Sequence, residues 1–377
     1  MTNRERILAC FSHKQPDRVP VSIGTTMVDS MTCHALNNYE AFCGREVTTP
    51  EVTNRFMRTA ALPEWIWEKI GMEFRPVRHA ASLAADTVYH EDGSFTDNFG
   101  IYWKKSGAYF DPVKGPWESE SITAEQVRDY QWPDPHNYNS DFYATSGIRE
   151  ECIRLREAGY VVVADLVAYG TFEQACWMRG FSNLLADFYE DEKLIEAIFE
   201  KTTQTAMDQF DCQLSVIGDV IDVVCHGDDL GMQDRSFFSP ALYHKFIKKH
   251  HKRVIDFVKS KTKAKVFLHT CGSVYELIPG LIEAGVDILN PVQPKAWNMQ
   301  MEKLKKEFGK DMIFWGGIDT QDMLQNGTAA QIRDEVKKLA DNFGRDGGFV
   351  LAPSHNIQSS VDPAKIEAML CALGECR

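Results

Sequence analysis

Short apolar runs alternate with longer helical patterns through the second half of the chain. The runs hold four or five residues, many of them β-branched, as buried strands of a parallel sheet do. Six such strands are predicted, at 161–165, 221–225, 265–269, 286–290, 312–315 and 348–352. Two upstream candidates, at 18–22 and 73–77, raise the total to eight. Eight strands that alternate with helices predict an α/β fold, the (β/α)₈ barrel, with closure inferred from the count.

A different pattern follows the second predicted strand. Residues 86–109 combine a Gly-containing turn at 91–94 with alternating aromatic residues, which is typical of antiparallel hairpins. We interpret residues 86–118 as an inserted β-hairpin. The chain is then one barrel domain over 1–377 that carries this insertion.

Residue composition and spacing predict the structure of other segments. Residues 29–70 form an N-terminal segment that is predicted to be helical, and 112–138, rich in proline and aromatic residues, is expected to be loop or lid. Several apolar residues fall at helical spacing and are predicted to be core: Trp177, Met178, Phe181, Leu184 and Leu185.

Composition and charge narrow the class of protein. Hydrophobic residues make up 44% of the chain and charged residues 25%, as in globular proteins. The net charge of −13 argues against nucleic acid or an anionic membrane as partner, and the basic run at 248–253 is predicted to be a solvated helix face. No apolar stretch approaches the ~20 residues of a membrane span, and the N-terminus lacks a signal-peptide pattern. We therefore expect a cytoplasmic protein, with its ten scattered cysteines mostly reduced.

The candidate chemistry lies after the strands, because a (β/α)₈ barrel carries its reactive groups at the carboxyl ends of its strands. His269 and Cys271 are two residues apart in extended backbone, so their side chains point the same way and can share one zinc ion. His355, after the last strand, is the first choice for a third ligand. The alternative is a hydrogen-bonded barrel histidine and a buried thiol.

Three carboxylates are candidate catalytic residues. Asp228 and Asp229 follow the fourth predicted strand, where one could cap a helix or one could enter the barrel mouth as a fourth zinc ligand or substrate partner. Glu173 opens the helix after the third of these strands and could reach inward. A first-turn carboxylate also stabilises the helix dipole, which is the alternative role of Glu173.

Polar residues at other strand ends are candidates for binding the substrate: His226, Asn290, Asp319 and Asn356. In extended backbone His226 shares its direction with Asp228, so it faces away from the mouth if Asp229 faces inward. The chain contains no Gly-x-Gly-x-x-Gly and no Gly-x-x-x-x-Gly-Lys motif, so a nucleotide cofactor is not expected.

Several motifs resemble the uroporphyrinogen decarboxylase superfamily, and together they cover almost the whole chain. They are Asn3-Arg4-Glu5-Arg6-Ile7-Leu8, Pro16-Asp17-Arg18-Val19-Pro20-Val21, Phe267-Leu268-His269-Thr270-Cys271-Gly272-Ser273, residues 284–293 and Trp315-Gly316-Gly317-Ile318-Asp319. The resemblance implies a distorted (β/α)₈ barrel. The decarboxylase branch carries an arginine-bearing segment after its first strand, whereas residues 23–29 of this chain contain no arginine.

The corrinoid-dependent methyltransferase branch is the better match. Its zinc-binding His-x-Cys resembles His269-x-Cys271, and His355 stands where the branch that methylates coenzyme M has a third, cysteine ligand. The resemblance implies that zinc-dependent transfer takes the methyl group of a small methyl ether or methylamine to the Co(I) of a separate corrinoid-binding protein. Alternatives are the reverse half-reaction toward a thiol or tetrahydrofolate, a decarboxylase, or a ligand-binding barrel without metal. A homodimer is compatible with the sequence.

Overall fold

The computed structural model describes residues 1–377 except 79–86, 120, 135, 137–142, 144 and 376–377. Its centre is a curled parallel sheet of seven strands in the order β13-β12-β11-β10-β9-β8-β3. These strands are β3 (Phe74–Val77), β8 (Val161–Ala164), β9 (Val223–Gly227), β10 (Lys265–His269), β11 (Ile288–Val292), β12 (Ile313–Ile318) and β13 (Phe349–Pro353). The neighbours follow chain order, and the fold is the predicted distorted (β/α)₈ barrel.

Within the described part of the chain, the first predicted strand, at 18–22, forms a single isolated bridge, from Val21 to Leu351 of β13. Leu351 N–H donates to the Pro20 carbonyl at 2.9 Å, and Ser22 N–H donates to the Leu351 carbonyl at 3.0 Å. Pro20 has no N–H of its own to give to a ladder, which limits how far this strand can extend.

Ionic contacts close the seam between residues 18–22 and β3. The Glu73 carboxylate, fully buried just before β3, lies 2.7 Å from Arg18 Nη2 and 3.4 Å from Arg6 Nη1. Arg6 belongs to α1 (Asn3–Phe11), so one buried carboxylate beside β3 joins that strand to the N-terminal helix and to the segment 18–22. Among the described residues, these side-chain ion pairs join the segment 18–22 to β3 and so connect the two sides of the seam.

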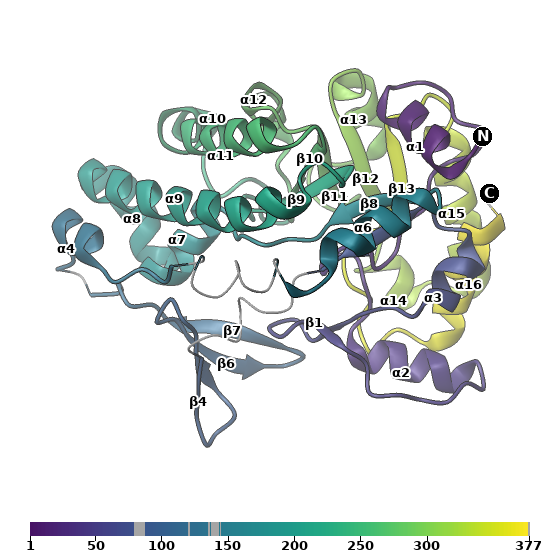
Figure 1. The fold of residues 1–377 in the computed structure, drawn as a ribbon, viewed down its shortest axis with the longest axis horizontal. Helices are drawn as coiled ribbons and strands as arrows, with labels where there is room; N and C mark the ends of the chain where they lie inside the picture. The colour runs from purple at the N-terminus through teal and green to yellow at the C-terminus, as the bar shows by residue number, and fades with distance from the viewer. Residues whose placement is uncertain (79–86, 120, 135, 137–142, 144, 376–377) are drawn as a thin grey trace.

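Helices cover the outside of the sheet (Figure 1). Those after residue 143 are α6 (Ile148–Glu157), α7 (Thr171–Arg179), α8 (Phe181–Glu190), α9 (Glu192–Ile217), α10 (Pro240–Leu242), η1 (Tyr243–Ile247), α11 (Lys248–Lys261), η2 (Tyr275–Leu277), α12 (Ile278–Ala284), α13 (Met301–Phe308), α14 (Met323–Asn326), α15 (Ala329–Phe343) and α16 (Pro363–Glu375). None of the helices in the described part of the chain is long and apolar enough to cross a membrane.

The N-terminal segment 29–70 is only partly helical. It contains α2 (Cys33–Phe42) and α3 (Glu64–Ile70), separated by a small antiparallel pair, β1 (Val52–Asn54) and β2 (Thr59–Ala60). The segment 112–138 likewise contains α4 (Ala124–Asp129), whose N-cap Thr123 accepts the Gln126 N–H, and its residues 120, 135, 137 and 138 lie outside the described residues.

The insertion is a four-stranded antiparallel sheet, which extends below the barrel in Figure 1. It comprises β4 (Val88–Tyr89), β5 (Phe95–Thr96), β6 (Tyr102–Ser106) and β7 (Tyr109–Lys114). The predicted inserted hairpin is therefore confirmed; its described strands lie within the expected range 86–118 but number four, and residue 86 lies outside the described residues. Trp103 anchors the sheet, with its ring 4.0 Å from that of Phe56.

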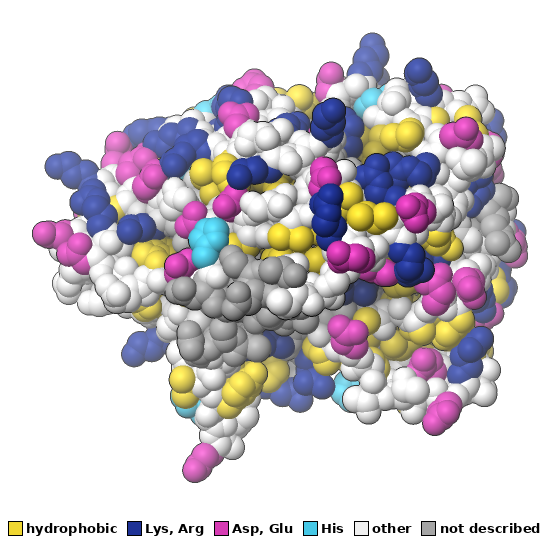
Figure 2. All heavy atoms as spheres, viewed as in Figure 1, with side chains coloured by type: hydrophobic (Ala, Val, Ile, Leu, Met, Phe, Trp, Pro, Cys, Tyr) yellow, Lys and Arg dark blue, Asp and Glu magenta, His cyan; other side chains and the backbone are white. Residues whose placement is uncertain are grey.

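The basic run at 248–253 lies in α11; its Lys and Arg residues are exposed or half-buried, as predicted, whereas His250 and His251 are buried. Lys249 and Arg253 pair with Glu196 and Glu200 of the neighbouring α9. Figure 2 shows Lys and Arg side chains interspersed with Asp and Glu across one face of the molecule. These basic side chains thus form ion pairs with acidic residues of the same chain.

We expect Glu73→Gln to lower the free energy of unfolding by about 3 kcal/mol, because it removes the buried carboxylate that pairs with the half-buried Arg18 and with Arg6, which keeps its pair with Asp17. Glu151→Gln is the matched control, since Glu151 forms an exposed pair with Arg154 that contributes less than about 1 kcal/mol. Urea unfolding measures both. Equal effects of the two substitutions would contradict this role for the seam.

Candidate functional site

Three potential metal ligands meet at the carboxyl ends of β10 and β13. The ligand atoms of His269, Cys271 and His355 all lie within 4.8 Å of one another. His269 Nε2 is 3.4 Å from Cys271 Sγ, and the two imidazole rings are 5.8 Å apart. His269 is buried, whereas Cys271 and His355 are half-buried. The arrangement predicted from the His-x-Cys spacing and a second strand end is therefore present.

Asn290 fixes the orientation of the His269 ring. The Asn290 Nδ2 group donates to the Trp315 carbonyl at 3.3 Å, which leaves its Oδ1 2.7 Å from His269 Nδ1. An amide oxygen can only accept, so Nδ1 carries the proton and the lone pair of Nε2 faces Cys271. Ligating histidines in proteins are commonly held in this way. Asn290 was expected to bind substrate; the structure places it behind His269.

Asp229 lies beside the cluster. Its Oδ1 accepts the Cys271 N–H at 2.7 Å and is 3.9 Å from His269 Nε2, and its side chain is 36% exposed. The same carboxylate therefore positions the backbone of one potential ligand and approaches another. Of the two candidate carboxylates, Asp229 is therefore the one beside the cluster.

Asp228 points away from the cluster, and of the two adjacent carboxylates it is the one that caps a helix. Its carboxylate is fully buried and accepts the N–H groups of Phe172 at 3.1 Å and Glu173 at 2.7 Å. His251 Nε2 of α11 lies 2.7 Å from the same carboxylate. Asp228 thus satisfies the free N–H groups at the start of α7, the helix of the preceding βα unit.

Glu173 lies on the first turn of α7 and faces the site. Burial raises the pKa of Glu173 well above its usual range, and the Asp229 and Asp228 carboxylates raise it further. A protonated Glu173 can donate a hydrogen bond where an ionised one only accepts.

The remaining three candidates do not line the mouth. His226 lies within β9, which begins and ends two residues later than predicted, and its ring packs 5.5 Å from that of Phe210 on α9. Asp319 accepts backbone N–H groups of 321–323. Asn356 accepts the Ser30 N–H at 2.7 Å and donates to the Met27 carbonyl at 3.0 Å. Asp319 and Asn356 thus form hydrogen bonds within the barrel framework, and the His226 ring packs against α9.

A cavity of about 260 Å³ adjoins the cluster through Asp229 and Glu173. Its lining includes Trp177 and Phe181, which helical spacing predicted as core, while Met178 and Leu184 are indeed buried. A helical wheel cannot distinguish a ring that packs on the sheet from one that borders a cavity. The insertion also contributes to the lining, through Pro112 of β7.

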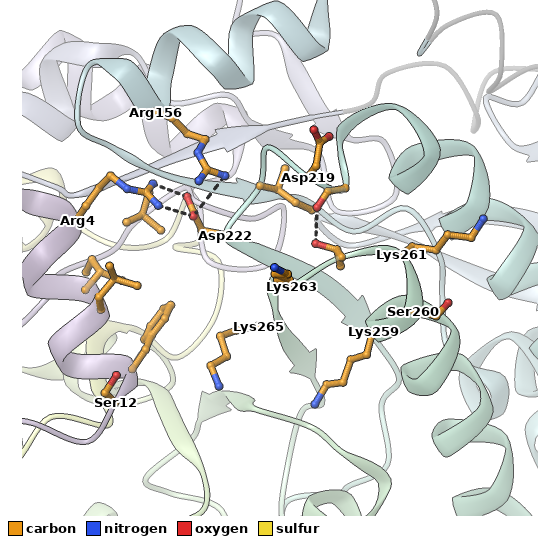
Figure 3. Close-up of a pocket in the computed structure, with 17 residues that line it drawn as sticks. Arg4, Ser12, Arg156, Asp219, Asp222, Lys259, Ser260, Lys261, Lys263 and Lys265 are labelled. Carbon is orange, nitrogen blue, oxygen red and sulfur yellow. Dashed lines mark hydrogen bonds and ion pairs between the residues drawn. The ribbon is translucent and has the colours of Figure 1, made fainter.

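A larger cavity, of about 830 Å³, lies at the opposite end of the barrel, by the amino ends of β8, β9 and β10. Figure 3 shows Arg4 and Arg156 converging on Asp222 there. The Arg4 Nη2 to Asp222 Oδ1 distance is 2.8 Å. Because barrel enzymes react at the carboxyl ends of their strands, this cavity belongs to the stabilising end of the fold.

Comparisons with known proteins give a family and a fold. A family model described as uroporphyrinogen decarboxylase (URO-D) matches residues 107–375. No curated protein sequence matches the chain. A solved methyltransferase from Methanosarcina mazei is similar over 100% of this chain and 99% of its own, with a TM-score of 0.67 and 17% identity. A GH113 β-1,4-mannanase aligns over 83% of this chain and 91% of its own, with a TM-score of 0.39 and 10% identity.

Burial lowers the pKa of His226 to about 4, so the unfolded chain takes up this proton near pH 6.5 and the folded one does not. Stability from this group is therefore lost as pH falls, by about 2 kcal/mol between pH 7 and pH 5. We expect His226→Leu to reduce that loss by this amount in urea unfolding. Replacement of the exposed His34 by Gln should leave the loss unchanged, and an unchanged loss in His226→Leu would contradict the buried neutral ring.

Proposed function

The chain belongs to the uroporphyrinogen decarboxylase family, and from this premise we propose that it is a zinc-dependent methyltransferase of the corrinoid-dependent branch. It demethylates a small methylated substrate, a methyl ether or methylamine, and transfers the methyl group to the Co(I) of a partner corrinoid-binding protein. The observation that carries this proposal is the convergence of His269, Cys271 and His355 at the barrel mouth.

The three side chains suit zinc. Imidazole nitrogen and thiolate sulfur are the usual donors to this ion, and catalytic zinc takes three protein ligands with one position open. The fixed Nε2 of His269 and the half-buried positions of Cys271 and His355 support the same assignment. Zinc bound there supplies a Lewis acid for the electron pair that develops on the leaving heteroatom.

The chain's own residues account for the rest of the proposed chemistry. Asn290 holds His269 in the tautomer that presents Nε2. Asp229 holds the Cys271 backbone, and Glu173 places a carboxyl group of raised pKa at the cavity wall. The cavity positions the methyl carbon, since in-line transfer to the corrinoid requires a defined approach. Asp228 acts as a positioning residue that fixes the start of α7.

The decarboxylase alternative has less support. The loop 23–29, where that branch carries arginine, turns its own Asp29 inward. Asp29 accepts the Thr26 N–H at 2.7 Å and the Ser22 hydroxyl at 3.0 Å. The loop therefore offers no guanidinium group of its own to a carboxylate-rich tetrapyrrole.

Metal content gives the first test. We expect about one zinc ion per chain in protein purified without added metal, and loss of most of it in Cys271→Ala and in His355→Ala, because each ligand contributes strongly to affinity. Cys371→Ala, which removes a half-buried thiol outside the cluster, should keep the metal. Circular dichroism should show the same fold in all variants. Stoichiometric zinc in Cys271→Ala would overturn the assignment.

Methyl transfer gives the second test. Enzyme, reduced corrinoid protein and a panel of methyl ethers and methylamines are mixed, and the Co(I) to methyl-Co(III) spectral change is followed. We expect the change with a matching donor, and a loss of at least 100-fold in rate after chelation, because the leaving group then lacks its Lewis acid. Unchanged transfer after complete zinc removal would contradict this role, and S-methylcysteine at Cys271 would instead show a covalent route.

A further inference from the structure

The cavity beside the metal-ligand cluster is lined mainly by aromatic and acidic residues. Four lining residues are aromatic, three are acidic and none is basic. The aromatic residues are Phe172, Trp177, Phe181 and Phe237, and the acidic residues are Glu118, Glu173 and Asp229. Glycine, proline and cysteine complete the set. The cavity therefore offers π faces together with the carboxylates of Glu118 and Asp229, while burial disfavours the ionised form of Glu173.

Neighbouring rings hold the aromatic residues in place. Trp177 packs edge-to-face against Tyr169 at 4.6 Å and against Trp103 of the inserted sheet at 5.1 Å. Across the cavity, Phe237 packs edge-to-face against Phe181 at 4.9 Å. Such contacts restrict ring motion, so the walls are formed before a ligand arrives.

The nearby basic residues have other partners. Arg179, the basic residue of α7, lies 2.7 Å from Asp187 and donates to the Trp117 carbonyl at 2.8 Å. Arg235, close in sequence to Phe237, pairs with Asp234 at 2.7 Å. The negative charge of the cavity is therefore not balanced by the described residues that line it.

Building on the proposed function, we propose that the methyl donor is an N-methylated ammonium compound whose cationic head occupies this cavity. Aromatic rings attract such cations, and the carboxylates supply opposite charge. The volume of about 260 Å³ suits a small head group. Zinc in the cluster would offset the charge of Asp229, so the aromatic faces and the Glu118 carboxylate carry the preference for a cationic head group over an anionic or neutral one.

The transfer step balances for this substrate. The carbon–nitrogen bond breaks with both electrons left on nitrogen, so the ammonium becomes a neutral amine. The methyl carbon bonds to cobalt through the electron pair of Co(I), which becomes Co(III). The leaving amine has lost the charge that the cavity binds, which favours its release.

Calorimetric titration of the purified full chain tests the proposal with choline and its neutral carbon analogue, 3,3-dimethylbutan-1-ol. We expect choline to bind at least tenfold tighter, and less tightly at high salt. Trp177→Leu should weaken choline binding about tenfold, and Trp177→Phe should retain most of it. Trp297→Leu, at a 46% exposed tryptophan outside the cavity, is the matched control and should change nothing. Equal affinity for both compounds, or no effect of Trp177→Leu, would overturn the proposal.

The cobalt assay separates this inference from the proposed function. Cobalt methylation by neutral ethers, without methylation by ammonium donors, would refute the ammonium substrate and leave the methyltransferase intact. Choline binding through Trp177, without cobalt methylation by any donor, would refute the methyltransferase and retain the cation site. Glu118→Gln should weaken choline binding, whereas the exposed Glu157→Gln should not.

Discussion

A buried carboxylate at the end of β9 organises the site without lining it. Asp228 is removed from water, and such a charge is tolerated only where hydrogen bonds replace its solvation. The first N–H groups of α7 and the His251 ring of α11 provide them. One strand and two helices are thereby tied to a single point. Gly170 is part of the same contact, because a Cβ there would overlap the Asp228 carboxylate.

Because of this contact, the adjacent residues Asp228 and Asp229 have different roles. Asp228 faces α7, so the next residue, Asp229, turns to the other side and reaches Cys271. The same anchoring sets where α7 begins, and with it the positions of Glu173 and Trp177 on successive turns toward the cavity. The lining of the cavity therefore depends on where α7 begins, and Asp228 after β9 fixes that position.

The parallel strands and the His-x-Cys pair were predictable because both follow from periodicity: apolar runs mark buried strands, and extended backbone places alternate side chains on one side. His355 could be chosen because strand ends in a barrel meet at one edge. The partners of polar side chains were not predictable. Asn290 and Asn356 are both strand-end amides, yet one holds a histidine and the other ties down the loop at Met27. Local sequence does not encode which distant group each will meet.

β3 is the last strand of the described sheet, so its outer edge makes no backbone hydrogen-bond ladder with another described strand. The sequence of β3 is suited to an edge strand. The Glu73 and Val77 carbonyls accept N–H groups from β8, so the alternate residue Pro76 directs its ring nitrogen outward. Proline at such a place offers no donor to an incoming strand. While the barrel is still assembling, its exposed border is thus a poor template for pairing with another chain, and the incomplete wall is protected from aggregation by its own sequence.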